Sequence, residues 1–265
     1  MADNKPTMEG ALDEARRSAL EVTSQAGRLV AAGKKAAKAA EVGDLKALRQ
    51  VLASLVDIAD QAGEAAVRAA GGWAFATEND EEEYLGDGRY QKELLTAAKD
   101  AKVGLFPVEG VLACFPSLVR INAKDRAVAI DRKPFRFVRP SYLVAHLRAV
   151  QNKPGRFNPG ALLESLHSAY ELGLAKKKGA GKVASLMDLY KILTLLPTVK
   201  KDYSHQEFAR DLYLLEESGV VETRSGARIR FHAATGTKSP GQVMRIVNRN
   251  GTERLYSAVE FEGGG

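Results

Sequence analysis

The chain of 265 residues contains one cysteine, Cys114, and one tryptophan, Trp73. A single cysteine cannot form an intrachain disulfide, and it excludes a metal site built from several cysteines. No apolar run approaches the roughly 18 residues that a membrane span needs. The first residues, Met1 to Pro6, lack the basic and then apolar layout of a secretory signal. We therefore expect a cytoplasmic protein that makes no contact with a membrane.

Signatures of catalysis are also scarce. The segment Gly179–Lys182 ends like a phosphate-binding loop, but Lys176 stands where that loop requires glycine and Val183 where it requires serine or threonine. The four histidines are scattered and form no paired zinc-binding motif: His146, His167, His205 and His232. The sequence predicts a protein that is not an enzyme and that holds no cofactor and no metal ion.

One pattern keeps a catalytic alternative open. Asp131 and Lys133 resemble the acidic-x-lysine half of the restriction-type nuclease core, in which two carboxylates hold a divalent metal. A second carboxylate is expected on a preceding strand, but Leu118–Asn122 contains none and Glu109 is remote in sequence. A metal-dependent nuclease is therefore the weakest of three hypotheses.

The net charge of +6 is divided unevenly along the chain. Residues 1–117 carry 14 Lys and Arg against 19 Asp and Glu, whereas residues 118–265 carry 25 against 14. The second part, with a balance of +11, is a candidate for binding a polyanion, most simply nucleic acid. The alternative to nucleic-acid binding is an ordinary, well-solvated basic surface.

Two long helices are predicted at the start of the chain. Met8–Ala40 and Leu45–Ala70 are rich in alanine and charged residues, and Gly43-Asp44 separates them. So short a break favours an antiparallel hairpin. Its apolar positions are mostly alanines, which bury little area, so residues 8–70 are expected either to pack as an ordinary helical layer or to bind a protein partner or a second copy.

The middle of the chain predicts a small antiparallel sheet between helices. The acidic run Glu78–Glu83 is expected to be a solvated loop, and Tyr84–Lys102 a helix. Leu118–Asn122, Ala127–Asp131 and Phe135–Val138 have the length and alternation of short strands. Helices are expected to begin at Pro140 and, with Asn158 as N-cap, at Pro159.

The last third contains two helices and two hairpin signals. Ala184–Leu196 has helical apolar spacing, and a second helix begins at Ser204, which with Glu207 has the capping-box spacing. Gly219 is placed to end that helix. Ser225-Gly226 and Asn250-Gly251 lie between strand-like runs and indicate two β-turns.

Two helices followed by basic hairpins resemble a winged-helix domain, and this resemblance covers only the last third of the chain. It implies that the second helix enters the major groove of duplex DNA, with Gln206 and Arg210 facing bases and His205 beside them. It also implies phosphate contacts from the basic residues around the helix and the wing: Lys200, Lys201, Arg224, Arg228 and Arg230.

The sequence as a whole predicts a mostly helical α+β protein. The expected parts are a helical hairpin (1–72), a middle domain with a small antiparallel sheet (73–175), a basic linker (176–183) and a winged-helix-like domain (184–262). The favoured function is non-enzymatic binding of double-stranded DNA, as a regulator or a subunit of a DNA-handling assembly. Acidic residues in the second helix favour the alternative, a protein–protein adaptor.

Overall fold

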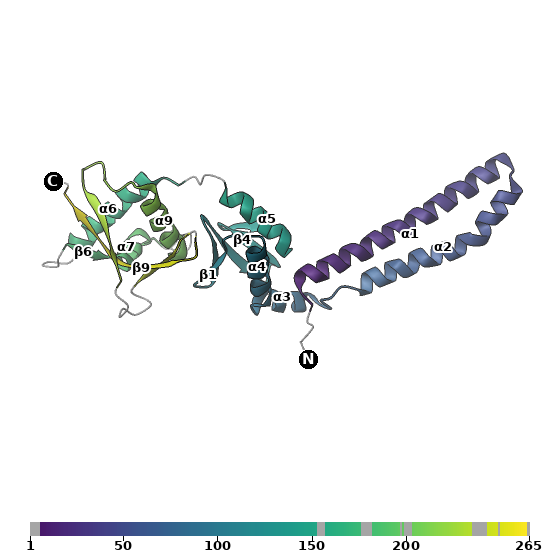
Figure 1. The fold of residues 1–265 in the computed structure, drawn as a ribbon, viewed down its shortest axis with the longest axis horizontal. Coiled ribbons are helices and arrows are strands. Elements are labelled where there is room, and N and C mark those ends of the chain that lie inside the picture. The colour runs from purple at the N-terminus through teal and green to yellow at the C-terminus, as the bar shows by residue number, and fades with distance from the viewer. Residues whose placement is uncertain are drawn as a thin grey trace. The chain divides into compact units, whose positions relative to one another are not determined.

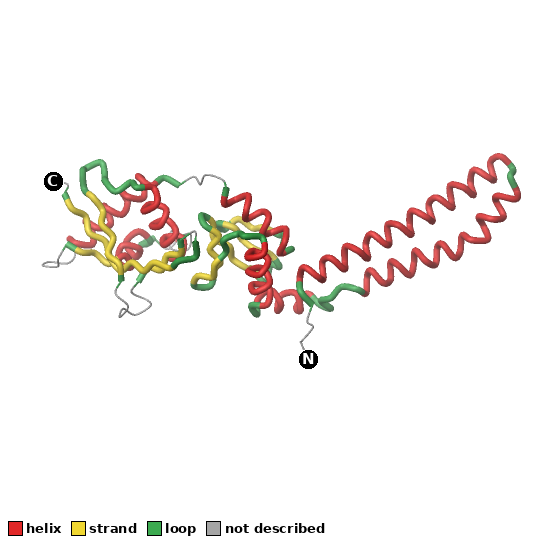
Figure 2. The backbone as a smooth tube through the Cα atoms, in the orientation of Figure 1, coloured by secondary structure: helices red, strands yellow, loops and turns green. Residues whose placement is uncertain are grey.

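The structure is a computed structural model that describes residues 6–152, 157–175, 182–196, 198, 203–234, 243–248 and 250–263. The fold is α+β and mostly helical, as the sequence predicts (Figures 1 and 2). The chain forms two compact units. The first combines Met1–Leu94 with Ala123–Arg126 and Phe137–Tyr142, and the second combines Leu95–Asn122, Ala127–Arg136 and Leu143–Gly265.

The first unit is dominated by the antiparallel hairpin of α1 (Met8–Val42) and α2 (Leu45–Gly71). Gly43 ends α1 in the left-handed conformation with φ 74°, and the side chain of Asp44 accepts from the N–H of Ala47 to begin α2. The break predicted at Gly43-Asp44 is therefore confirmed, together with its physical cause.

The acidic run is a helix and not a loop. Residues Glu78–Gly86 form α3, because Thr77 and Asp80 make a reciprocal capping box at its start. Carboxylates in a first helical turn are favoured by the helix dipole, and this is the signal that the sequence interpretation missed. A break at Asp87 separates α3 from α4 (Arg89–Asp100), so the single helix expected from Tyr84 is two.

Glu93 of α4 fixes the beginning of α1. Its carboxylate accepts hydrogen bonds from the backbone N–H groups of Met8 (2.9 Å) and Glu9 (2.8 Å) and from the hydroxyl of Tyr84 (2.7 Å). Arg139 adds ion pairs to Glu9 and Asp13 in the first turns of α1. The N-terminal N–H groups that a helix leaves unpaired are thus satisfied by a residue far away in sequence.

The second unit contains a five-stranded antiparallel sheet in which each strand pairs with the next along the chain. Its strands are β1 (Phe106–Val108), β2 (Val111–Cys114), β3 (Ser117–Asn122), β4 (Ala127–Ile130) and β5 (Lys133–Phe135). The middle strands are the most buried, and Val119 of β3 and Val128 of β4 have no exposed area. The last strand begins at Lys133, two residues before the expected run.

A two-residue turn of Asp131 and Arg132 joins β4 to β5. Both residues have positive φ, 46° and 68°, which is the backbone of the hairpin turns that match sheet twist. This conformation is strained for side chains other than glycine, asparagine and aspartate, so Arg132 is held there by surrounding contacts. Asp131 therefore lies in a turn and not on the strand where the sequence interpretation put it.

The last part of the second unit begins with α5 (Pro140–Gln151), shared between the two units, and α6 (Pro159–Ala175). The side chain of Asn158 accepts from the N–H of Ala161 at 3.0 Å, which confirms it as the N-cap of α6. Next comes β6 (Val183–Ser185), so the helix expected from Ala184 starts only at α7 (Leu186–Leu193). Then α9 (His205–Ser218) begins at the predicted capping box and ends at Gly219, with φ 69°.

Three further strands complete this part: β7 (Arg228–Ala233), β8 (Met244–Val247) and β9 (Glu253–Glu262). The sheet order is β6-β9-β7, and β8 also pairs with β9. Around Ser225-Gly226 the only pairing among the described residues is a bridge between Glu222 and Arg228, so the first expected hairpin is short. The second, around Gly251, is present.

One hydrophobic core joins α6, α7, α9 and the last strands. Leu166, Leu186 and Phe208 are fully buried in it. Phe115, which follows β2, enters the same core and packs edge-on against Tyr213 of α9 at 4.7 Å between ring centroids. Phe115 therefore connects the end of β2 to α9. The expected linker, 176–183, lies outside the described residues except for Lys182 and Val183, and it stays a prediction.

Candidate nucleic-acid interface

The first turn of α9 combines a helix cap with a buried carboxylate. The side chain of Glu207 accepts from the backbone N–H of Ser204 at 2.7 Å, and the hydroxyl of Ser204 accepts from the N–H of Glu207 at 3.4 Å. Glu207 is only 7% exposed. Burial alone would raise the pKa of its carboxyl, but hydrogen bonds from Arg132 and Ser204 outweigh burial and hold the pKa at about 2.

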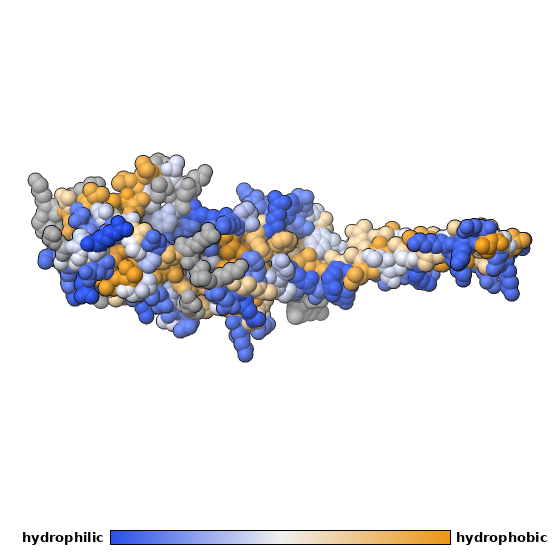
Figure 3. Space-filling model, turned by 90° about the horizontal axis from the view of Figure 1, so that it is seen from above, coloured by the Kyte–Doolittle hydropathy of each residue, from blue (hydrophilic) through white to orange (hydrophobic). Residues whose placement is uncertain are grey.

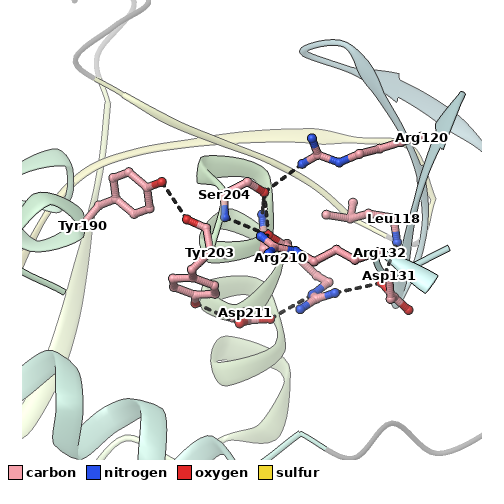
Figure 4. A network of polar contacts seen from close by, with 10 residues as sticks. Leu118, Arg120, Asp131, Arg132, Tyr190, Tyr203, Ser204, Arg210 and Asp211 are labelled. Atoms are coloured by element: carbon pink, nitrogen blue, oxygen red, sulfur yellow. Dashed lines mark hydrogen bonds and ion pairs between the residues drawn. The ribbon is translucent and has the colours of Figure 1, made fainter. Parts of the chain in front are cut away.

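The turn between β4 and β5 supplies the counter-ion of Glu207. The guanidinium of Arg132 donates to both carboxylate oxygens of Glu207. On β3, Arg120 donates to the hydroxyl of Ser204 at 2.9 Å. Figure 4 shows both arginines reaching from the sheet toward the start of α9. A bidentate pair of this kind is among the strongest polar contacts in proteins, and it fixes orientation as well as distance.

Arg210, the residue expected to read bases, is held between two carboxylates. Its Nη1 lies 2.9 Å from Oδ1 of Asp131 in the turn, and its Nε lies 2.8 Å from Oδ1 of Asp211 (Figure 4). Asp131 also accepts from the backbone N–H of Leu118 at 3.0 Å. Asp211 accepts from the hydroxyl of Tyr203 at 2.8 Å. Burial and this carboxylate raise the pKa of Tyr203 above its ordinary value.

The other residues predicted at the start of α9 also contact the sheet. Gln206 donates to the carbonyl of Glu109, in the turn between β1 and β2, at 3.3 Å. His205 lies 3.6 Å from the Glu109 carboxylate, and Arg245 of β8 lies 3.9 Å from it. The polar side of α9 that the sequence assigns to DNA is therefore engaged by turns of the same unit. No local sequence pattern signals this, because its partners lie about 75 to 100 residues away.

The predicted phosphate contacts divide into two groups. Lys200 and Lys201 lie outside the described residues. Arg228 and Arg230 alternate with buried Ile229 on β7, so both project from the same exposed side of that edge strand, and Arg224 is exposed in the preceding turn. The side chains of Arg228 and Arg230 are 66% and 63% exposed, although Glu222 (3.6 Å) and Glu262 (2.9 Å) lie beside them.

The positive charge is concentrated near the five-stranded sheet. Residues 118–136, which span the last three strands of this sheet and their turns, carry 6 Lys and Arg against 2 Asp and Glu, whereas residues 159–265 carry 15 against 12. Lys133 and Arg136, at and just after edge strand β5, are exposed. The imidazole of His146 packs on the ring of Phe135 with 4.5 Å between ring centroids. The sequence interpretation assigned this charge to the C-terminal helices and strands, and a finer division of the same counts would have located it.

The two carboxylates of the nuclease pattern, Asp131 and Glu109, contact different residues. Asp131 is engaged by Leu118 and Arg210, and Glu109 by His205 and Arg245. Within the described ranges, no group of three or more His, Cys, Asp or Glu side chains is arranged to hold a metal ion. The geometry therefore adds nothing to the nuclease hypothesis.

Comparisons of the chain with protein-family models, with curated proteins and with solved structures found no match in any of the three. None of the described helices is both long enough and apolar enough to cross a membrane.

Proposed function

We propose that the chain is a non-enzymatic protein that binds duplex DNA through the part that extends from α6 to β9. The observation that carries the proposal is the order helix, strand, helix, helix and strands, with sheet order β6-β9-β7 beside α9. Winged helices place a helix and a basic β-hairpin side by side in this way. Three exposed arginines of this part, Arg224, Arg228 and Arg230, supply the first phosphate contacts.

Base reading by α9 requires a change in the chain. Gln206 and Arg210 face turns of the five-stranded sheet, and DNA cannot replace those turns unless the Arg132–Glu207 pair opens. We therefore propose two modes of binding. In the observed conformation the protein binds phosphates without sequence preference, and release of α9 adds base contacts.

Substitution of Arg132 tests whether α9 must be released before it contacts bases. Arg132→Gln removes the counter-ion of Glu207, and Arg136→Gln is the matched control, because it removes one exposed cation from the same segment. Anisotropy with a pool of random duplexes, followed by sequencing of the bound fraction, measures preference. We expect Arg132→Gln to gain sequence preference and Arg136→Gln to keep the wild-type preference. If the two variants behave alike, α9 does not read bases.

A protein–protein adaptor is the second candidate, and the engagement of α9 favours it. The polar side of α9 is already bound by residues of the five-stranded sheet and its turns. The helix then serves as a structural element, and other surfaces bind the partners. Acidic Glu216 and Glu217 near the end of α9 are also unfavourable beside phosphates. Absence of DNA binding even at low salt would select this candidate over the first.

A further inference from the structure

The helical hairpin has a regular inner seam. On α1 its residues recur at alternating steps of three and four, and so do those on α2. The seam residues of α1 are Met8, Ala11, Ala15, Ser18, Val22, Gln25, Leu29, Ala32, Ala36 and Ala39. Those of α2 are Leu48, Val51, Leu55, Ile58, Ala62, Ala65 and Ala69. Only five of these seventeen are buried, so two helices alone do not enclose the seam.

A second apolar row follows one position after the seam residues from Ser18 to Ala39 on α1 and from Val51 to Ala69 on α2. On α1 it comprises Ala19, Thr23, Ala26, Val30, Gly33, Ala37 and Ala40, and on α2 it comprises Leu52, Val56, Ala59, Gly63, Ala66 and Ala70. All thirteen are exposed. One position is about 100° around a helix. Because α1 and α2 run in opposite directions, the same 100° step brings both rows to the same side of the hairpin, here called the apolar face.

The opposite side of the hairpin is charged. The positions one residue before the seam include the charged residues Glu14, Arg17, Glu21, Arg28, Lys35 and Lys38 on α1, and Asp57, Glu64 and Arg68 on α2. The apolar face carries no charge between Ala19 and Ala40 or between Leu52 and Ala70. Exposed apolar side chains are visible along the hairpin in Figure 3. Solvent contact explains the charged side but not the apolar one.

Large side chains and glycines on the apolar face both indicate a closely packed neighbour. Val30, Leu52 and Val56 are 56%, 50% and 66% exposed. Gly33 and Gly63 lie inside helices, where glycine is less stable than alanine, yet a Cβ on either would meet no atom within 4 Å. Nothing within the hairpin requires glycine at these two positions, and their lack of a side chain leaves room for another helix to approach closely.

We propose that the apolar face binds the apolar face of a second copy of this chain, which completes a four-helix bundle. The face extends for about 30 Å along each helix and is about 20 Å wide, which gives roughly 600 Å² per copy before side chains at the rim are added. This is close to the roughly 800 Å² per partner of stable interfaces. The alternating spacing of both rows is the spacing with which helices pack in such bundles.

The distribution of side-chain size selects both the partner and its direction. The turn at Gly43-Asp44 is here called the tip of the hairpin, and the opposite end its base. The large residues of α2, Leu52 and Val56, lie toward the tip, whereas Gly63, Ala66 and Ala70 lie toward the base. A second copy that runs tip to base sets large side chains against small ones along the whole face. A tip-to-tip copy would set Val30 against Val56 and leave a gap at the base. The face is therefore complementary to itself, as a two-fold interface requires.

Matched alanine substitutions on the two sides of α1 test the proposal in the full chain. Ala37→Glu places a charge on the apolar face, and Ala31→Glu places the same charge on the opposite side, where Ala31 is exposed. Light scattering should give twice 28.6 kDa for the wild type and Ala31→Glu, and 28.6 kDa for Ala37→Glu. A wild-type monomer at micromolar concentration, or equal masses for both variants, would overturn the proposal.

Single cysteines test the direction, since Cys114 is buried and does not compete. Under oxidation, a mixture of Leu52→Cys and Ala66→Cys chains should form a mixed disulfide, whereas Leu52→Cys alone should not cross-link. Gly33→Ala gives an independent readout: it should stabilise the helix and yet weaken the dimer by tenfold or more. If Gly33→Ala leaves dimerisation unchanged, the close approach of helices is wrong. Cross-linking of Leu52→Cys to itself would refute the tip-to-base arrangement.

Discussion

The guanidinium of Arg132 donates two hydrogen bonds to the carboxylate of Glu207, across 75 residues of sequence. Arg132 lies in a two-residue turn with positive φ, and Glu207 also caps the helix that it begins. The pair thereby joins a strained turn of the sheet to the first turn of α9. The pair contributes to stability because Glu207 is buried. If Arg132 is removed, the carboxylate keeps a charge that water hardly reaches.

Arg132→Ala should lower the free energy of unfolding by about 2 kcal/mol. The substitution leaves Glu207 buried without its counter-ion, and the figure is below the range for fully buried pairs because the Arg132 side chain is 35% exposed. Urea denaturation measures it. Arg136→Ala, which removes an exposed cation nearby, should change stability by less than about 0.5 kcal/mol. Equal effects of the two substitutions would show that the pair contributes nothing specific.

Acid should weaken the same contact. The folded-state pKa of Glu207 is about 2, below the ordinary 4.5, so the ionised carboxylate stabilises the fold above pH 4.5. This contribution is lost as the pH falls from 4.5 toward 2, and its upper limit is about 3 kcal/mol. The stability difference between wild type and Glu207→Gln should therefore shrink below pH 4.5. A difference that stays constant between pH 6 and pH 3 would contradict the assignment.

Glu93→Ala should loosen the beginning of α1. It removes the acceptor of the Met8 and Glu9 N–H groups and of the Tyr84 hydroxyl, at a cost of about 2 kcal/mol. Hydrogen exchange should show faster exchange in the first turn of α1, while the middle of α2 is unchanged. Glu64→Ala, which removes only an exposed pair with Arg68, is the control. Unchanged exchange at Met8 and Glu9 would refute the role given to Glu93.

Cys114 should be inert in the folded protein. It has no exposed area, and burial raises the pKa of its thiol to about 12, so almost no thiolate forms near neutral pH. A thiol reagent should label it only at the rate at which the second unit opens, and rapidly in denaturant. Fast labelling under native conditions would show that β2 is less protected than the structure indicates.

Local patterns in the sequence were sufficient for the ends of several helices. Gly43 and Asp44, Ser204 with Glu207, and Gly219 all act through atoms within a few residues, so their spacing alone predicts the caps. The acidic run of α3 was misread because a first-turn cluster of carboxylates resembles a solvated loop when the capping residue Thr77 is overlooked.

The candidate site could not be predicted in the same way. The winged-helix resemblance assigns base reading to Arg210 of α9, but Asp131 and Asp211 hold this side chain, and the Asp131 contact depends on how the sheet packs. On the hairpin, the apolar positions of α1 appeared as one stripe. Only the pairing of α1 with α2 divides them into a half-buried seam containing Val22 and Leu29, and an exposed row containing Ala26 and Val30.

DNA affinity measured across a salt series tests the central claim most directly. Three full-length proteins are compared by anisotropy on one labelled duplex: the wild type, a variant with Arg224, Arg228 and Arg230 changed to Gln, and a control with Lys34, Lys35 and Lys38 changed to Gln. The control removes the same charge from exposed positions of α1.

If each of the three arginines meets one phosphate, the slope of log K against log salt should flatten by about 2.7 in the first variant, and the control should keep the wild-type slope. Absence of wild-type binding at low salt, or the same slope for both variants, would contradict DNA binding through this part of the chain.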